Sequence, residues 1–105
     1  MTDSRVLLVD GIKNIRHLKQ TVSTTEINVL EEMFPTGIPD SIFHVRAVVT
    51  NDAAARFNVN GCAAATANAM YASQSIPLDV RMYIDSVKCV RDGSTDANCE
   101  ITVWW

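Results

Sequence analysis

The chain has 105 residues, of which 48% are hydrophobic and 20% charged, and its formal net charge is -3. This length argues for one compact domain over residues 1–105, and the hydrophobic content argues against intrinsic disorder. An acidic chain disfavours binding to DNA, RNA or an anionic membrane, because such binding requires a basic surface. No apolar run approaches the length of a membrane-spanning helix.

The first residues, MTDSRVLLVDG, lack the basic segment and the long apolar segment of a signal peptide. We therefore expect a protein of the cytoplasm or of a virion, not one secreted through a cleavable signal peptide. Arg5–Val9 predicts a short strand. The three cysteines, Cys62, Cys89 and Cys99, form an odd count, which favours free thiols inside a cell.

Two helices are predicted in the first third of the chain. Residues 12–22 carry apolar side chains every three or four positions, which is the spacing of an amphipathic helix. Residues 23–34 predict a second helix, because Ser23 and Glu26 have the spacing of a capping box and Pro35 ends the pattern.

The middle of the chain combines strand and helix signals. Ser41–Thr50 alternates apolar and polar residues, which predicts a half-buried strand. Arg56–Asn60 predicts another strand, followed by the turn pair Asn60-Gly61. The alanine-rich residues 62–72 favour a third helix, although a reading in which this region is β-structure remains open.

The last third predicts strands. Residues 76–85 alternate, and the apolar phase changes at Ser86, which indicates a bulge or a strand that passes between two packing environments. A polar loop then leads to a final strand over residues 99–105. The whole pattern predicts a small α+β domain with an antiparallel sheet of about four to five strands and two to three short helices. The alternative is an all-β sandwich.

The polar loop resembles half of a calcium site, because oxygen-bearing side chains occupy every second position, at Asp92, Ser94, Asp96 and Asn98. The match is partial: Ala97 stands where the motif needs glycine, and Val103 where it needs glutamate. The same residue types are also typical of turns. We therefore expect no metal and no other cofactor.

Cys89 and Cys99 flank this loop on two strands that we expect to pair. They form a possible disulfide if their geometry permits it. Two small buried thiols are the favoured alternative, because the cysteine count is odd.

No catalytic signature is found. His17 and His44 have no motif partner, and Cys62 lies in no nucleophile motif. We therefore expect no catalytic residues and no enzyme activity. A ligand-binding domain that used His44, Arg46 and Tyr83 on outward strand faces would need a concave pocket.

The chain ends on two adjacent tryptophans. Neighbouring residues of a strand point to opposite faces, so Trp105 is expected inside, with Ile101 and Val103, and Trp104 outside. Tryptophan is enriched at the anchoring centres of interfaces. Two explanations of Trp104 are near equal: a partner covers it, or a helix of the same domain does.

These observations favour a non-enzymatic structural or accessory subunit of a larger protein assembly, for example a bacteriophage virion accessory or capsid-decorating protein. Its partner would be protein, either another copy or a larger assembly, so an oligomer or docked subunit is expected, with no nucleic acid and no membrane. The expected partner-binding residues are Trp104 and Trp105, with Met33, Phe34 and Ile38 as a second contact region that is equally consistent with core.

The alternative function is a small acidic inhibitor or interaction module that binds a host protein. Glu26, Glu31, Glu32 and the Asp92–Asp96 loop would carry it through a complementary basic surface. Salt would weaken such binding, whereas an apolar docking surface is salt-tolerant.

Overall fold

The computed structural model describes residues 14–61 and 70–105, which form eight strands and one short helix. The elements, in chain order, are β1 (Ile15–Val22), β2 (Ile27–Asn28), α1 (Val29–Met33), β3 (His44–Val49), β4 (Ala54–Val59), β5 (Met70–Ser73), β6 (Leu78–Val80), β7 (Val87–Arg91) and β8 (Ala97–Trp104). This helix is too short to cross a membrane, and no other helix occurs in the described ranges.

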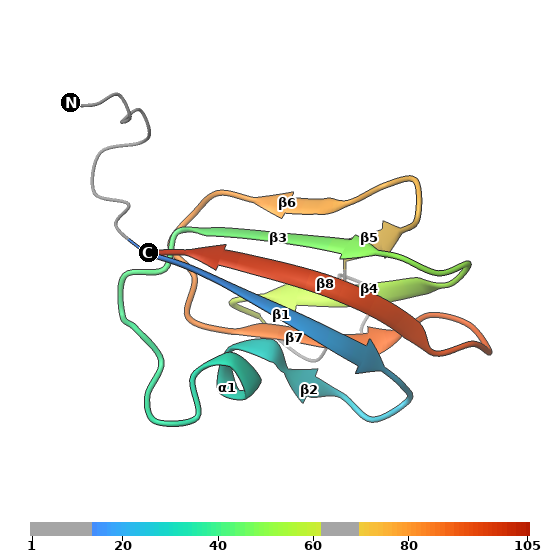
Figure 1. The fold of residues 1–105 in the computed structure, drawn as a ribbon, viewed down its shortest axis with the longest axis horizontal. Coiled ribbons are helices and arrows are strands. Elements are labelled where there is room, and N and C mark those ends of the chain that lie inside the picture. Colours follow the sequence, from blue (N-terminus) through green and yellow to red (C-terminus); the bar gives the residue numbers. More distant parts are fainter. Residues whose placement is uncertain (1–13, 62–69) are drawn as a thin grey trace.

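The strands form two antiparallel sheets that pack face to face. Sheet A has the order β1-β8-β3-β6, and sheet B has the order β2-β7-β4-β5. In Figure 1, sheet A lies in front of sheet B. The pairings are nested from the ends of the chain inward: β1 pairs with β8, β2 with β7, β3 with β6 and β4 with β5. These are the pairings of an eight-stranded jelly roll, a long hairpin rolled into two sheets.

The predicted α+β fold with two to three helices is therefore wrong, and the all-β sandwich, its alternative, fits the structure. The reason is that nearly every segment of the rolled hairpin lies beside another strand. Backbone amides and carbonyls therefore form their hydrogen bonds between strands and not within helices. Pairing with a distant strand overrides the helical spacing of apolar residues, because the helix propensities of ordinary residues differ by less than about 1 kcal/mol.

The core lies between the two sheets. Inward-facing residues of β8 are at most 2% exposed, and they are Ala97, Cys99, Ile101 and Val103. Phe57 of β4 and Leu30 of α1 are fully buried. Burying each large apolar side chain contributes about 1.5–3 kcal/mol. The alternation predicted for Ser41–Thr50 and for the last strand is confirmed.

Strand β1 replaces the helix predicted over residues 12–22. All eight of its residues pair with β8, from Ile15 opposite Trp104 to Val22 opposite Ala97. The helical spacing of apolar residues was misleading because an edge strand such as β1 needs few apolar residues on its inner side. Leu18 and Val22 are enough to cover the core there. Residues 12 and 13 lie outside the described ranges, as does the strand predicted at Arg5–Val9.

Helix α1 is much shorter than the helix predicted from Ser23. Its N-cap is Asn28, whose side chain accepts a hydrogen bond of 3.2 Å from the amide of Leu30. The capping box from Ser23 is therefore wrong. The helix cannot begin earlier because Ile27 and Asn28 are paired with β7 as strand β2.

The third predicted helix, over residues 62–72, is contradicted at its end. Met70–Ser73 forms strand β5, which pairs with β4. The remaining residues of that prediction, 62–69, lie outside the described ranges. At Asn60 the backbone has a φ of 58°, the left-handed conformation that the predicted Asn-Gly turn favours.

The change of apolar phase at Ser86 marks a passage between the sheets. Strand β6 lies in sheet A and β7 in sheet B. The side chain of Asn60 holds the connecting segment: its Nδ2 donates to the carbonyl of Tyr83, and its Oδ1 accepts from the amides of Asp85 and Ser86 at 2.7 and 3.3 Å. The strand predicted over residues 76–85 is therefore wrong beyond Val80: residues 81–86 form the connection between two separate strands, and Met82, expected on the inner side, is 47% exposed.

Candidate interaction face

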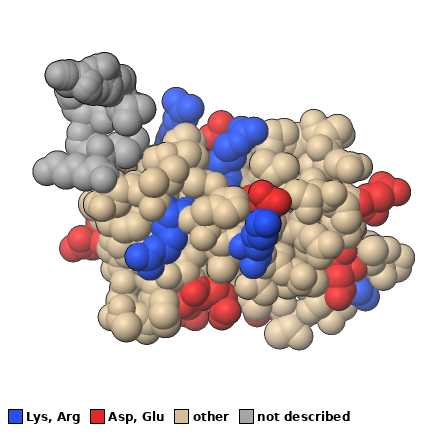
Figure 2. All heavy atoms as spheres, in the orientation of Figure 1, with Lys and Arg blue, Asp and Glu red and all other residues tan. Residues whose placement is uncertain are grey.

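The outer face of sheet A, here called the front face, points toward the viewer in Figure 1, and none of the described elements lies over it. Its side chains are the outward ones of four strands. They are Ile15, His17, Lys19 and Thr21 of β1, Asn98, Glu100, Thr102 and Trp104 of β8, His44, Arg46 and Val48 of β3, and Asp79 of β6. Figure 2 shows basic, acidic and neutral groups interspersed on this side of the molecule.

Trp104 lies in a row of three side chains that crosses the front face. In the strand register, Ile15 and His44 are its neighbours on either side. The rings of Trp104 and His44 are stacked, with centroids 4.1 Å apart and planes inclined by 17°. Ile15 is 62% exposed. This Trp104 row is therefore a partly exposed apolar strip in a polar surface.

His44 is held against Trp104 by an acidic neighbour. Its Nε2 lies 2.6 Å from Oδ1 of Asp79. Asp79 also lies 3.5 Å from the guanidinium of Arg46 and 4.0 Å from that of Arg81. Exposed ion pairs contribute little to stability, so the main effect of this cluster is to orient the imidazole and to surround one carboxylate with positive charge.

His17 joins two residues of β8 on the same face. Its Nδ1 lies 3.0 Å from the hydroxyl of Thr102, and its Nε2 lies 3.6 Å from a carboxylate oxygen of Glu100. The side chains of His17 and Glu100 are 47% and 41% exposed. These groups are therefore solvated and form polar surface contacts.

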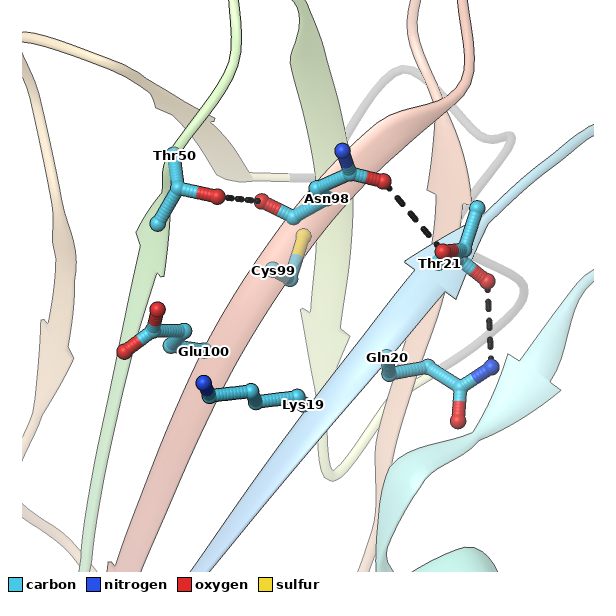
Figure 3. Close-up of a pocket in the computed structure, with 7 residues that line it drawn as sticks. All are labelled: Lys19, Gln20, Thr21, Thr50, Asn98, Cys99 and Glu100. Carbon is cyan, nitrogen blue, oxygen red and sulfur yellow. Dashed lines mark hydrogen bonds between the residues drawn. The ribbon is translucent and has the colours of Figure 1, made fainter.

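One end of the front face is hollowed, with a volume of about 290 Å³. The residues that line the hollow, drawn in Figure 3, are Lys19, Gln20, Thr21, Thr50, Asn98, Cys99 and Glu100. Its polar groups largely satisfy one another: the hydroxyl of Thr21 donates to Oδ1 of Asn98, and the hydroxyl of Thr50 donates to the Asn98 carbonyl, both at 3.2 Å. The hollow is polar and open, unlike the mostly apolar pockets of small ligands.

Trp105 points inward, as predicted, and packs against the core. Its ring meets the edge of Phe34, with centroids 5.0 Å apart. The guanidinium of Arg16 lies 4.7 Å from the Phe34 ring and 5.8 Å from the Trp105 ring, and donates to the carbonyl of Met33 at 2.9 Å. Met33 and Phe34 are 5% and 6% exposed, and Ile38 packs partly buried against the core.

The second contact region expected at Met33, Phe34 and Ile38 thus lies in or against the core, the other possibility that the sequence left open. Among the expected anchors, Trp104 alone lies on the front face. Ile15, beside Trp104, and Lys19, beside Glu100, were not expected on this face, because a helix was predicted where β1 lies. Of the residues considered for ligand binding, His44 and Arg46 meet at Asp79, whereas Tyr83 lies in the loop after β6 and is 57% exposed.

The carboxylates of the polar loop are directed to arginines. Asp92 lies 3.0 Å from Nε of Arg56, and Asp96 lies 2.7 Å from a guanidinium nitrogen of Arg91. Among the described residues, no group of three or more His, Cys, Asp or Glu side chains could hold a metal ion.

Cys89 and Cys99 lie on strands that do not pair with each other, because β7 belongs to sheet B and β8 to sheet A. The expected hairpin between them is therefore wrong. Both are free, buried thiols. Burial raises the pKa of Cys89 to about 12 and that of Cys99 to about 11. Both are protonated near neutral pH, which makes them poor nucleophiles. Cys62 lies outside the described ranges.

Comparisons with known proteins give no counterpart for this chain. No protein-family model matches it, and no curated protein or solved structure is significantly similar to it. Inference about function therefore rests on the geometry of the front face.

Proposed function

We propose that this protein is a non-enzymatic subunit of a larger protein assembly, such as a virion accessory or capsid-decorating protein, and that it docks through the front face. One observation carries the proposal: Trp104 lies on an outer sheet face over which no described element lies. Tryptophan is among the residues most enriched at the energetic centres of interfaces.

The Trp104 row has the anatomy of a small docking centre. Apolar and aromatic side chains form it, and the adjacent row of the front face is polar, with His17, Thr102 and Arg46. Interfaces combine such a centre with a polar rim. The stack on His44 also restricts the indole before binding, so less side-chain entropy is lost when a partner covers it.

The jelly roll is compatible with this proposal but does not decide it. This architecture occurs in viral capsids, lectins and cupins, and one fold commonly serves unrelated functions. Among the roles that this architecture serves, we propose the virion role because it requires neither a catalytic centre nor an enclosed ligand cavity.

The acidic interaction module is less well supported. Glu31 and Glu32 are exposed on α1. The carboxylates of Asp92 and Asp96, however, already pair with arginines, so a basic partner would have to displace those contacts. Binding through the Trp104 row should change little with added salt, whereas binding through carboxylates should weaken steeply.

The test is the solution mass of the Trp104→Ala variant, measured by light scattering over a concentration series beside the unchanged protein. We expect the unchanged protein to self-associate and the variant to dissociate at concentrations at least about tenfold higher, the shift typical of losing one interface anchor. Tyr83→Ala is the matched control, because Tyr83 is an exposed aromatic residue outside the front face.

Two results would count against the proposal. If Trp104→Ala unfolds the monomer, as judged by circular dichroism, then Trp104 is a structural residue and the docking assignment is wrong. If Tyr83→Ala changes the mass as much as Trp104→Ala does, association does not depend on the Trp104 row. A monomer at every concentration would exclude self-assembly and leave docking on a foreign protein.

A further inference from the structure

The edge of sheet A offers a second, independent contact. Strand β1 is the last strand on its side of sheet A, is eight residues long and contains no proline. Asn14 and Trp105 exchange both backbone hydrogen bonds, at 2.7 and 3.1 Å. In an antiparallel pair such doubly bonded positions alternate with positions whose backbone groups point away from the partner strand.

This alternation determines which backbone groups of β1 face outward. The positions bonded to β8 are the even-numbered residues from Asn14 to Val22. The amides and carbonyls of Ile15, His17, Lys19 and Thr21 therefore point away from β8. The Thr21 carbonyl accepts a 3.0 Å hydrogen bond from the side chain of Gln20. Within the described ranges, no backbone hydrogen bond outside the β1–β8 ladder involves these residues.

The charges of β1 disfavour pairing with the same strand of a second copy. Antiparallel pairing centred on Lys19 places the Lys19 side chains of the two copies opposite each other. Like charges directly opposite are destabilising, and lysine on an edge strand is a common protection against pairing between copies. Lys19 lies opposite Glu100 of β8 in the strand register, and Glu100 also lies 3.6 Å from His17. Arg16 points to the other face of the strand, against Phe34 and Trp105.

We propose that the edge of β1 binds an extended acidic segment of a partner protein, which adds to sheet A as a fifth strand. Its backbone would pair with the outward groups of Ile15, His17, Lys19 and Thr21, and one of its carboxylates would lie opposite Lys19. Strand addition derives affinity from main-chain bonds and specificity from alternate side chains. The inference rests on the proposed function in treating the chain as an assembly subunit, but its contact is this backbone edge and not the Trp104 row.

The probe is a synthetic peptide that alternates glutamate and valine over the length of β1. The readout is amide hydrogen exchange of the whole protein, followed by NMR. Without peptide, we expect the amides of Ile15, His17 and Lys19 to exchange much faster than those of Arg16 and Leu18. Saturating peptide should slow the first group by at least about tenfold, because they gain hydrogen bonds.

Three controls make the test specific. A peptide with lysine in place of glutamate should bind more weakly by roughly five- to tenfold, as should the glutamate peptide on Lys19→Glu, because each turns the attractive charge contact at Lys19 into a repulsive one. If Lys19→Glu folds poorly beside Glu100, Lys19→Gln replaces it. A peptide methylated on alternate backbone nitrogens should give no protection.

The proposal is overturned if the outward amides gain no protection at saturating peptide, if the lysine peptide binds equally well, or if the methylated peptide still protects. Hydrogen exchange of the β1 amides tests strand addition, whereas the solution mass of Trp104→Ala tests self-association through the Trp104 row. If either experiment fails, the result of the other can still be interpreted.

Discussion

Replacing Asn60 should destabilise the fold in a graded way, because this residue has two separate structural roles. Its backbone has a φ of 58°, which costs alanine more than asparagine or glycine. Its side chain also bonds the segment at Tyr83, Asp85 and Ser86, through which the chain passes from sheet A to sheet B.

The two contributions can be separated by two variants. Asn60→Gly removes the side-chain hydrogen bonds but keeps the left-handed conformation accessible. Each net hydrogen bond contributes about 0.5–1.5 kcal/mol, and this side chain is exposed, so we expect a loss of about 1–2 kcal/mol. Asn60→Ala adds about 1 kcal/mol for the left-handed backbone, which gives about 2–3 kcal/mol in total. For a domain of this size the alanine variant should melt roughly 8–20 °C lower.

Urea denaturation followed by tryptophan fluorescence would measure both free energies of unfolding. Equal stability of the glycine variant and the unchanged protein would refute the role of the side-chain bonds. Equal stability of the alanine and glycine variants would refute the argument from backbone conformation. Asn60→Asp keeps the acceptor, loses the donor to Tyr83 and places a second carboxylate near Asp85, so its stability should improve as the pH is lowered.

Two further perturbations test packing and burial. Arg16→Lys keeps the charge but loses the flat guanidinium over the rings of Phe34 and Trp105, and because Arg16 is exposed the free energy of unfolding should fall by about 0.5–1 kcal/mol in urea titrations; an unchanged value would show that this packing is not stabilising. The raised pKa values of Cys89 and Cys99 make the stability of the fold depend on pH. The contribution of these thiols to stability is fully present below pH 9.0, their ordinary pKa, and is lost as the pH rises through about 11 and 12. Thermal melts should therefore show a steeper loss of stability above pH 9 in the unchanged protein than in the double variant Cys89→Ala, Cys99→Ala; parallel curves would contradict this.

The front face could be predicted only in part. Trp104 was expected outside and Trp105 inside because neighbouring strand residues alternate, and this holds wherever the segment is a strand. The sequence carried no comparable signal for Ile15 and Lys19. Their place beside Trp104 and Glu100 follows from the pairing of β1 with β8, two segments at opposite ends of the described chain.

What the sequence determined by itself was local: the alternation of β3 and β8 and the turn at Asn60. Each depends on residues close together in the chain, whose side chains must alternate between core and solvent. Only the tertiary structure decided that residues 15–22 form a strand, that β6 and β7 belong to different sheets, and that Cys89 and Cys99 do not share a hairpin. The physical reason is that a strand is stabilised by a partner distant in sequence, and this non-local pairing outweighs the small local preferences visible in the sequence.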